Sequence, residues 1–121
     1  MRPVPAGQEL VISGFSADGW VVSERLYIGT LLITAERAWA LPPAGIEELD
    51  AAAMLKPLAE LAARPGLLLL GTGEKMRRPP AEFIAEARAQ GLTVEFMDSR
   101  AAARTYNVLI TEQRPVAALL L

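Results

Sequence analysis

The strongest fold signal in this sequence is the stretch Leu67-Leu68-Leu69-Leu70-Gly71-Thr72-Gly73, an apolar run that ends in a glycine-rich loop. The run predicts a buried strand, and Pro80, which suits the first position of a helix, predicts a helix that closes at Gly91. Residues 93–97 then repeat the strand pattern and lead at Asp98 into another helix. If the two strands are parallel neighbours, the loops that follow them open on one edge of the sheet, where open α/β proteins usually bind ligands.

The last part of the chain continues this pattern. The helix predicted from Ser99 to about Glu112 carries an apolar stripe at helical spacing, and Asp98 is placed to cap its first turn. The apolar run from Val116 to Leu121 predicts a final buried strand. The C-terminal half is therefore expected to consist of strand-helix-strand units.

The first half of the chain predicts short antiparallel strands. The dipeptide Asp18-Gly19 favours a hairpin turn, because glycine adopts a positive φ without steric cost. Asp50 is placed to cap a helix, which Pro57 should break into two short turns. The strand-like runs, separated by turn residues, are Leu10–Phe15, Trp20–Val22, Tyr27–Thr34 and Ala38–Leu41.

We therefore predict a fold of the α/β class. One compact domain is expected over residues 1–121, because a chain of this length buries enough surface to form a single core. The domain should have a mixed sheet, with strand-helix-strand units in the C-terminal half and an antiparallel hairpin part in the N-terminal half.

Composition and charge exclude several classes of protein. Hydrophobic residues make up 52% of the chain, but no window approaches the roughly 18 consecutive apolar residues of a membrane span, so the chain is not expected to be an integral membrane protein. The start, Met1-Arg2-Pro3-Val4-Pro5, shows no targeting segment and predicts a cytoplasmic protein. A net charge of −2 gives no electrostatic drive toward nucleic acid.

Cysteine and histidine are both absent from the chain. Their absence excludes a cysteine nucleophile, a serine-histidine dyad, a Cys/His zinc site and an imidazole acid or base. No other nucleophile and base are paired by a recognisable motif. We therefore predict no catalytic residues, no metal and no cofactor, and favour a non-enzymatic protein over a hydrolase or transferase.

The two loops at the predicted sheet edge hold the candidate site. The main chain of Gly71, Thr72 and Gly73 could cradle an anion, but a tight turn, in which Thr72 makes a local hydrogen bond, is the favoured interpretation. The nearby arginines form either an anion pocket or a solvated rim in which acidic neighbours balance them. The candidate ligand- or partner-binding residues are Gly71, Thr72, Gly73, Arg77, Arg78, Asp98, Arg100, Arg104 and Asn107.

Asn107 is interpreted separately from the other candidate binding residues. Asparagine is a poor helix former, so its place in the middle of the last predicted helix requires a reason. We expect its amide to be at least half buried and hydrogen-bonded to the main chain, in the loop of Gly71, Thr72 and Gly73. This expectation makes Asn107 structural, while a ligand-contacting role stays open.

Several segments together resemble a known family. They include Tyr27-Ile28-Gly29-Thr30-Leu31-Leu32, Trp39, the glycines of the loop, Arg78-Pro79-Pro80, Met97-Asp98 and Ala101-Ala102-Ala103-Arg104-Thr105-Tyr106-Asn107-Val108-Leu109. The chain resembles the uncharacterised family called domain of unknown function 498 (DUF498), whose mitochondrial members are assembly factors for respiratory complex I. The resemblance covers nearly the whole chain. It departs from the family at Ala103, where members often have a cysteine, so a thiol-based role does not carry over.

The resemblance implies a compact α/β fold, no established enzymatic activity and a role in assembling a respiratory complex through protein contacts. We accordingly predict an assembly or protein-interaction factor whose contact surface is the edge formed by Gly71–Arg78 and Asp98–Asn107. The alternative is a binder of a small anionic metabolite or nucleotide at Gly71–Arg78 and Asp98–Arg104. The expected partner is a protein, and a homodimer is left open.

Overall fold

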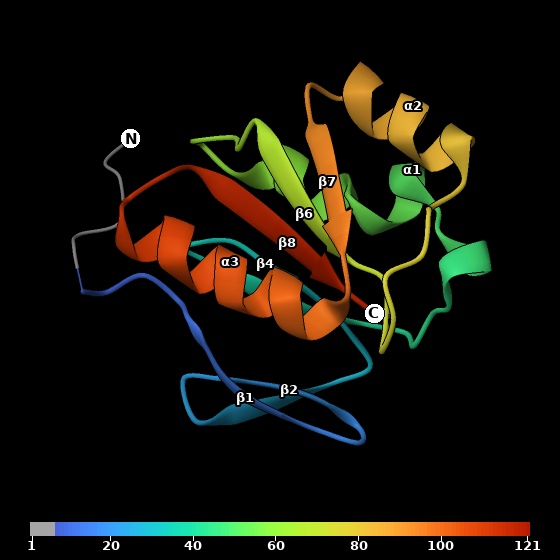
Figure 1. Ribbon diagram of the computed structural model, residues 1–121. Coiled ribbons are helices and arrows are strands. Elements are labelled where there is room, and N and C mark those ends of the chain that lie inside the picture. The colour runs from blue at the N-terminus through green and yellow to red at the C-terminus, as the bar shows by residue number, and fades with distance from the viewer. Residues whose placement is uncertain (1–6) are drawn as a thin grey trace.

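The computed structural model describes residues 7–121, so the expectation about Met1 to Pro5 falls outside the described residues. Two sheets and the helices that cover them make up this part of the chain (Figure 1). The strands are β1 (Ile12–Ser16), β2 (Gly19–Val22), β3 (Arg25–Ile28), β4 (Thr30–Ile33), β5 (Ala38–Leu41), β6 (Leu67–Gly71), β7 (Thr93–Met97) and β8 (Val116–Leu120). The helices are η1 (Ile46–Glu48), α1 (Ala51–Met54), η2 (Lys56–Glu60), α2 (Ala81–Ala89) and α3 (Ser99–Thr111).

The larger sheet has the strand order β5-β4-β8-β6-β7. Strand β6 pairs in parallel with both β7 and β8, whereas β4 pairs antiparallel with both β5 and β8. The predicted mixed sheet and the parallel pairing of the two C-terminal strand units are therefore confirmed. Because β6 and β7 are parallel neighbours, the loops that follow them leave the same edge of the sheet.

Alternate residues of the central strands face two separate cores. In β8, Ala118 and Leu120 pack with α3, whereas Ala117 and Leu119 pack with the helices on the opposite face. Figure 1 shows the same layers, with α3 on one face of the sheet and α1 and α2 on the other. Burial on both faces explains why these strands read as continuous apolar runs.

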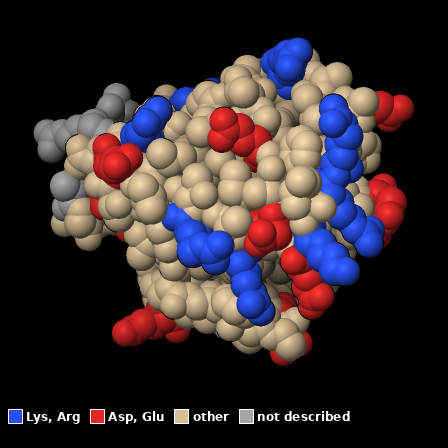
Figure 2. All heavy atoms as spheres, viewed as in Figure 1, with Lys and Arg blue, Asp and Glu red and all other residues tan. Residues whose placement is uncertain are grey.

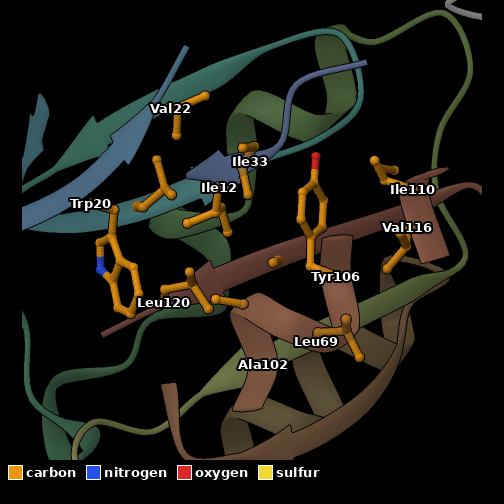
Figure 3. Packing of buried hydrophobic residues seen from close by; sticks show 13 residues of the cluster. Ile12, Trp20, Val22, Ile33, Leu69, Ala102, Tyr106, Ile110, Val116 and Leu120 are labelled. Carbon is orange, nitrogen blue, oxygen red and sulfur yellow. The ribbon is translucent and has the colours of Figure 1, made fainter. Parts of the chain in front are cut away.

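Tyr106 of α3 stands at the centre of the core between α3 and the larger sheet, which we call the first core (Figure 3). Its ring is fully buried, and its hydroxyl donates a 2.8 Å hydrogen bond to the carbonyl oxygen of Leu10. Burial, and secondarily the charge of Glu9, raises the pKa of the Tyr106 hydroxyl far above its usual range. The phenol is therefore neutral and connects α3 to the segment that leads into β1.

The smaller sheet has the order β1-β2-β3 and packs one face against α3. The single strand expected over Tyr27–Thr34 is wrong, because Gly29 has a φ of 94° and divides it into β3 and β4, which belong to different sheets. The hairpin at Asp18-Gly19 is confirmed, but the reason for its glycine differs. A Cβ on Gly19 would collide with the carbonyl oxygen of Tyr27, so close strand approach, rather than a positive φ, requires glycine there.

Most helices begin and end where the sequence predicts. Asp50 caps α1 by accepting a hydrogen bond from the N–H of Ala53, and the helix breaks near Pro57 into α1 and η2 as predicted. Pro80 is the N-cap of α2 rather than its first helical residue. Asp98 caps α3 by accepting a 2.9 Å hydrogen bond from the N–H of Ala101, as predicted.

Both longer helices end in a Schellman motif, and the difference between them yields a prediction. The left-handed position is Gly91 after α2, with a φ of 87°, but Gln113 after α3, with a φ of 61°. Because only glycine adopts this conformation freely, Gln113→Gly should stabilise the protein by about 0.5–1 kcal/mol, measured by urea denaturation. The matched change, Gly91→Ala, should destabilise it by about 1 kcal/mol. Two changes of the same sign would contradict this account.

Candidate functional site

Ser99, the first residue of α3, connects the loop after β6 with Leu121, the residue that follows β8. Its N–H donates to the carbonyl oxygen of Gly73, at 2.8 Å, and the N–H of Gly73 donates to its Oγ, also at 2.8 Å. The Ser99 hydroxyl in turn donates to the carbonyl oxygen of Leu121, at 2.8 Å, and the N–H of Leu121 donates to the carbonyl oxygen of Gly71, at 3.0 Å. We call Gly71, Gly73, Ser99 and Leu121 the Ser99 junction. It fixes the loop after β6, the start of α3 and the end of β8, which are distant from one another in sequence.

Thr72 shows how the glycine-rich loop uses its polar groups. Its N–H donates to the carbonyl oxygen of Met97, at 2.9 Å, and its hydroxyl lies 2.7 Å from the carbonyl oxygen of Lys75. The same hydroxyl oxygen accepts a 3.0 Å hydrogen bond from the N–H of Arg77. The N–H groups of both Thr72 and Gly73 are thus satisfied within the protein. This arrangement is that of a closed turn rather than an open cradle for an anion.

The four candidate arginines have different surroundings. Arg77 lies 3.9 Å from Glu47, and both side chains are exposed, so this pair contributes little to stability. Arg78 and Arg104 are exposed and form no ion pair with the residues that the structure describes. Figure 2 shows basic and acidic side chains interspersed over this face of the molecule. Arg100 differs from these three, since its guanidinium lies over an aromatic ring, 4.3 Å from the centre of the Phe15 ring.

Arg100 and Phe15 border a hollow between the β1–β2 hairpin and the Ser99 junction. This hollow, which we call the hairpin hollow, has a volume of about 610 Å³. Phe15 and Ile28 line it while remaining 52% and 63% exposed, so two large apolar side chains are accessible at one hollow. Trp20, which lies beside Phe15 with ring centres 6.0 Å apart, supports the hollow from the first core.

Asn107 is not part of the glycine-loop edge. Its Oδ1 accepts a 2.8 Å hydrogen bond from the N–H of Ile12, and its Nδ2 donates a 2.8 Å hydrogen bond to the carbonyl oxygen of the same residue. The expected bond to the main chain is therefore present, but the expected partner, the Gly71–Gly73 loop, is wrong. Asn107 lies more than two turns along α3 from Asp98, and there it attaches β1 to the helix.

The structure therefore divides the candidate residues. It brings Gly71, Thr72, Gly73 and Asp98 together in a hydrogen-bonded turn and helix cap, leaves three arginines on an exposed rim and places Asn107 against β1. Sequence reasoning missed Phe15 and Ile28, because their exposure depends on how the smaller sheet packs against α3. Over residues 7–121 no group of three or more carboxylates is arranged to hold a metal ion.

Solved structures share this arrangement of elements. A crystal structure of a Bordetella parapertussis protein has a TM-score of 0.81 and 28% sequence identity, and the match covers 97% of this chain and 98% of that one. A solution structure of a Bordetella pertussis protein, described as a Mth938-like domain, has a TM-score of 0.79 and 26% identity, covering 100% of this chain and 90% of that one. The fold is thus a mixed α/β domain of the Mth938-like class.

The chain belongs to the family described as protein of unknown function (DUF498/DUF598), whose sequence model matches residues 12–121. An uncharacterized protein of Rhodobacter capsulatus is 37% identical over 112 residues, which cover 93% of this chain and 84% of that protein. The "13 kDa major membrane protein" of Francisella tularensis is 43% identical over 61 residues, half of each chain.

A further relative carries a functional name. The NADH dehydrogenase (ubiquinone) 1 alpha subcomplex assembly factor 3 of Danio rerio is 29% identical over 123 residues, and the match covers 92% of this chain. This chain spans only 63% of the length of that relative. Within the described part of the chain, no helix combines the length and apolar character needed to cross a membrane.

Proposed function

We propose that this protein is a non-enzymatic assembly factor that binds a protein partner at the hairpin hollow, and that the partner belongs to a respiratory complex. The observation that carries the proposal is the exposure of Phe15 and Ile28 at the hollow of about 610 Å³. Large apolar side chains grouped at a hollow are typical of protein-binding sites. The relatives named as complex I assembly factors support a respiratory partner.

The chemistry of the hollow favours an apolar segment of the partner. Its charged lining residues are Asp18, Glu74 and Arg100, so two acidic side chains face one basic side chain. The Arg100 guanidinium lies over one face of the Phe15 ring, and the ring remains 52% exposed. A partner side chain that enters the hollow would therefore contact aromatic and aliphatic groups, with Arg100 at the rim for a hydrogen bond.

The alternative, a binder of an anionic metabolite or nucleotide, has weaker support. Two carboxylates beside Arg100 oppose the binding of a polyanion, and the N–H groups of Thr72 and Gly73 are already used. We expect nucleotides and phosphorylated metabolites to leave the melting temperature of the protein unchanged. A rise with any of them that saturates with concentration would favour the alternative instead.

The proposed function is tested by capture from the native cell. The double variant Phe15→Ser/Ile28→Ser should recover at least tenfold less of the respiratory-complex subunits that the parent protein recovers, because the apolar contact is removed. The measurement is quantitative mass spectrometry of the proteins captured by tagged parent and variant. Thermal melting checks that the variant remains folded, as expected for side chains that are already half exposed.

Val108→Ser is the matched control. Val108 is 56% exposed on α3 but does not line the hairpin hollow, so its replacement should leave recovery unchanged. Equal loss in the control and the double variant would contradict the assignment of the hollow. Failure of the parent protein to recover any respiratory-complex subunit would contradict the proposed partner.

A further inference from the structure

Strand β3 forms one edge of the smaller sheet. Among residues 7–121, no strand pairs with its outer side. The N–H of Gly29 donates to the carbonyl oxygen of Asp18, so these two residues form a hydrogen-bonded pair that continues the β2–β3 ladder. Such pairs alternate along an antiparallel ladder, and the N–H and C=O groups of Leu26 and Ile28 therefore point away from β2. They can hydrogen-bond to a further strand.

The same two residues carry exposed apolar side chains. Leu26 is 43% exposed, Ile28 is 63% exposed, and both lie on the face of the sheet opposite to Tyr27, which packs against the first core. Strand β3 has no proline, lysine or bulge, which are the usual means of keeping an edge strand unpaired. Its one charged side chain, Arg25, lies over the ring of Tyr27 on the other face. The edge of β3 is thus suited to pairing with another strand.

The other edges of the two sheets are less suited to pairing between copies of the chain. Asn107 occupies the edge of β1 through its two hydrogen bonds to Ile12. Symmetric pairing of two β7 strands about their middle residue would set Glu95 opposite its own copy, and like charges in this position are destabilising. In β5, over residues 38–41, no large apolar side chain is exposed.

We propose that two copies of this chain associate by pairing their β3 strands antiparallel, about a two-fold axis that passes through Tyr27. Leu26 of each copy then lies opposite Ile28 of the other, and their outward N–H and C=O groups form the hydrogen bonds of the new ladder. Strand β3 is complementary to itself in this register, because apolar residues meet apolar residues and Arg25 faces Gly29. This complementarity favours a second copy over an unrelated extended segment.

The contact is small, so the dimer should be weak and reversible. Each copy contributes an edge of four residues, compared with about 20–30 residues a side in a standard interface. A dissociation constant on the order of 100 µM is therefore expected.

The first test is sedimentation equilibrium of the full chain between about 10 µM and 1 mM. The parent protein should change from monomer to dimer over this range. Leu26→Lys should raise the dissociation constant at least tenfold, because it places a cation between the paired strands. Val108→Lys, which replaces an exposed apolar residue on α3, should leave it unchanged.

The second test uses disulfide formation, which is simple to interpret because the chain has no cysteine. Residues that face each other in a hydrogen-bonded pair have Cα atoms about 5.5 Å apart, within the range of a disulfide. An oxidised mixture of the single variants Leu26→Cys and Ile28→Cys should therefore give disulfide-linked dimers. Either variant alone should give few, because identical positions lie diagonally across the axis, about 7–8 Å apart.

Three results would overturn the proposal. They are a parent protein that stays monomeric throughout the concentration range, a dimer that Leu26→Lys does not weaken, and single cysteine variants that crosslink as well as their mixture. The proposal does not depend on the proposed function. Leu26 does not line the hairpin hollow, so Leu26→Lys should weaken the dimer without reducing the recovery of respiratory-complex subunits.

Discussion

Replacement of Gly71 with alanine should lower the free energy of unfolding by about 3 kcal/mol, near the upper end of what overpacking costs. The new Cβ would lie 2.8 Å from the Cα and the Oγ of Ser99 and 2.8 Å from Cδ2 of Leu120. The Ser99 Cα belongs to a main chain that is held by the hydrogen bonds of the Ser99 junction, so it cannot move away without weakening those bonds. Urea denaturation of the purified variant measures the loss.

Gly66→Ala provides the control for this substitution. Gly66 precedes β6, and a Cβ there would meet no atom within 4 Å. Its free energy of unfolding should therefore change by no more than about 0.5 kcal/mol. If Gly71→Ala were as stable as Gly66→Ala, the close packing of the Ser99 junction would not describe the protein in solution.

Asn107→Leu should destabilise the protein by about 3 kcal/mol, because it removes both partly buried hydrogen bonds between its amide and the main chain of Ile12. The effect should be local as well as global. Hydrogen exchange of the Ile12 amide should accelerate more than that of amides in β6, since Asn107 attaches the smaller sheet to α3.

Val108→Leu is the matched change at the neighbouring, exposed position of the same helix, and it should alter stability by less than about 0.5 kcal/mol. An Asn107→Leu protein with unchanged stability and an Ile12 amide that stays protected would rule out the attachment role. It would also return Asn107 to the set of side chains available for a ligand.

These two predictions decide whether Gly71 and Asn107 still count as candidate binding residues. Gly71 and Asn107 were selected with the arginines because they lie in or near one predicted edge, yet their contacts are internal to the fold. Arg100 differs from both, since its guanidinium lies at a hollow with exposed apolar walls. The proposed contact surface is therefore centred on Arg100, Phe15 and Ile28.

Local features of the sequence predicted much of the fold. Strand β6 follows from an apolar run and β7 from a strand-like run of the same length. The starts of α1 and α3 follow from Asp50 and Asp98, which accept hydrogen bonds from the main chain three residues away. The break at Pro57 has an equally local cause, because proline lacks the donor that the helix requires. Each of these features depends on residues close together in the chain.

Long-range contacts account for what the sequence did not reveal. Asn107 bonds to Ile12, 95 residues away, and no pattern around either residue indicates the other. Gly29 resembles an ordinary residue within an apolar run, and only the positions of both sheets explain its left-handed conformation. The hairpin hollow combines segments from both halves of the chain, so it could not be assembled from motifs alone.

The place of β8 in the larger sheet has a consequence for biosynthesis. This strand lies between β4 and β6, yet it follows every other strand in the sequence. While the ribosome is still translating, β4 with β5 and β6 with β7 can form only two separate partial sheets, each with an unpaired apolar edge that invites association with other chains. The larger sheet can therefore form as one unit only after residues 116–120 have emerged and joined the two partial sheets.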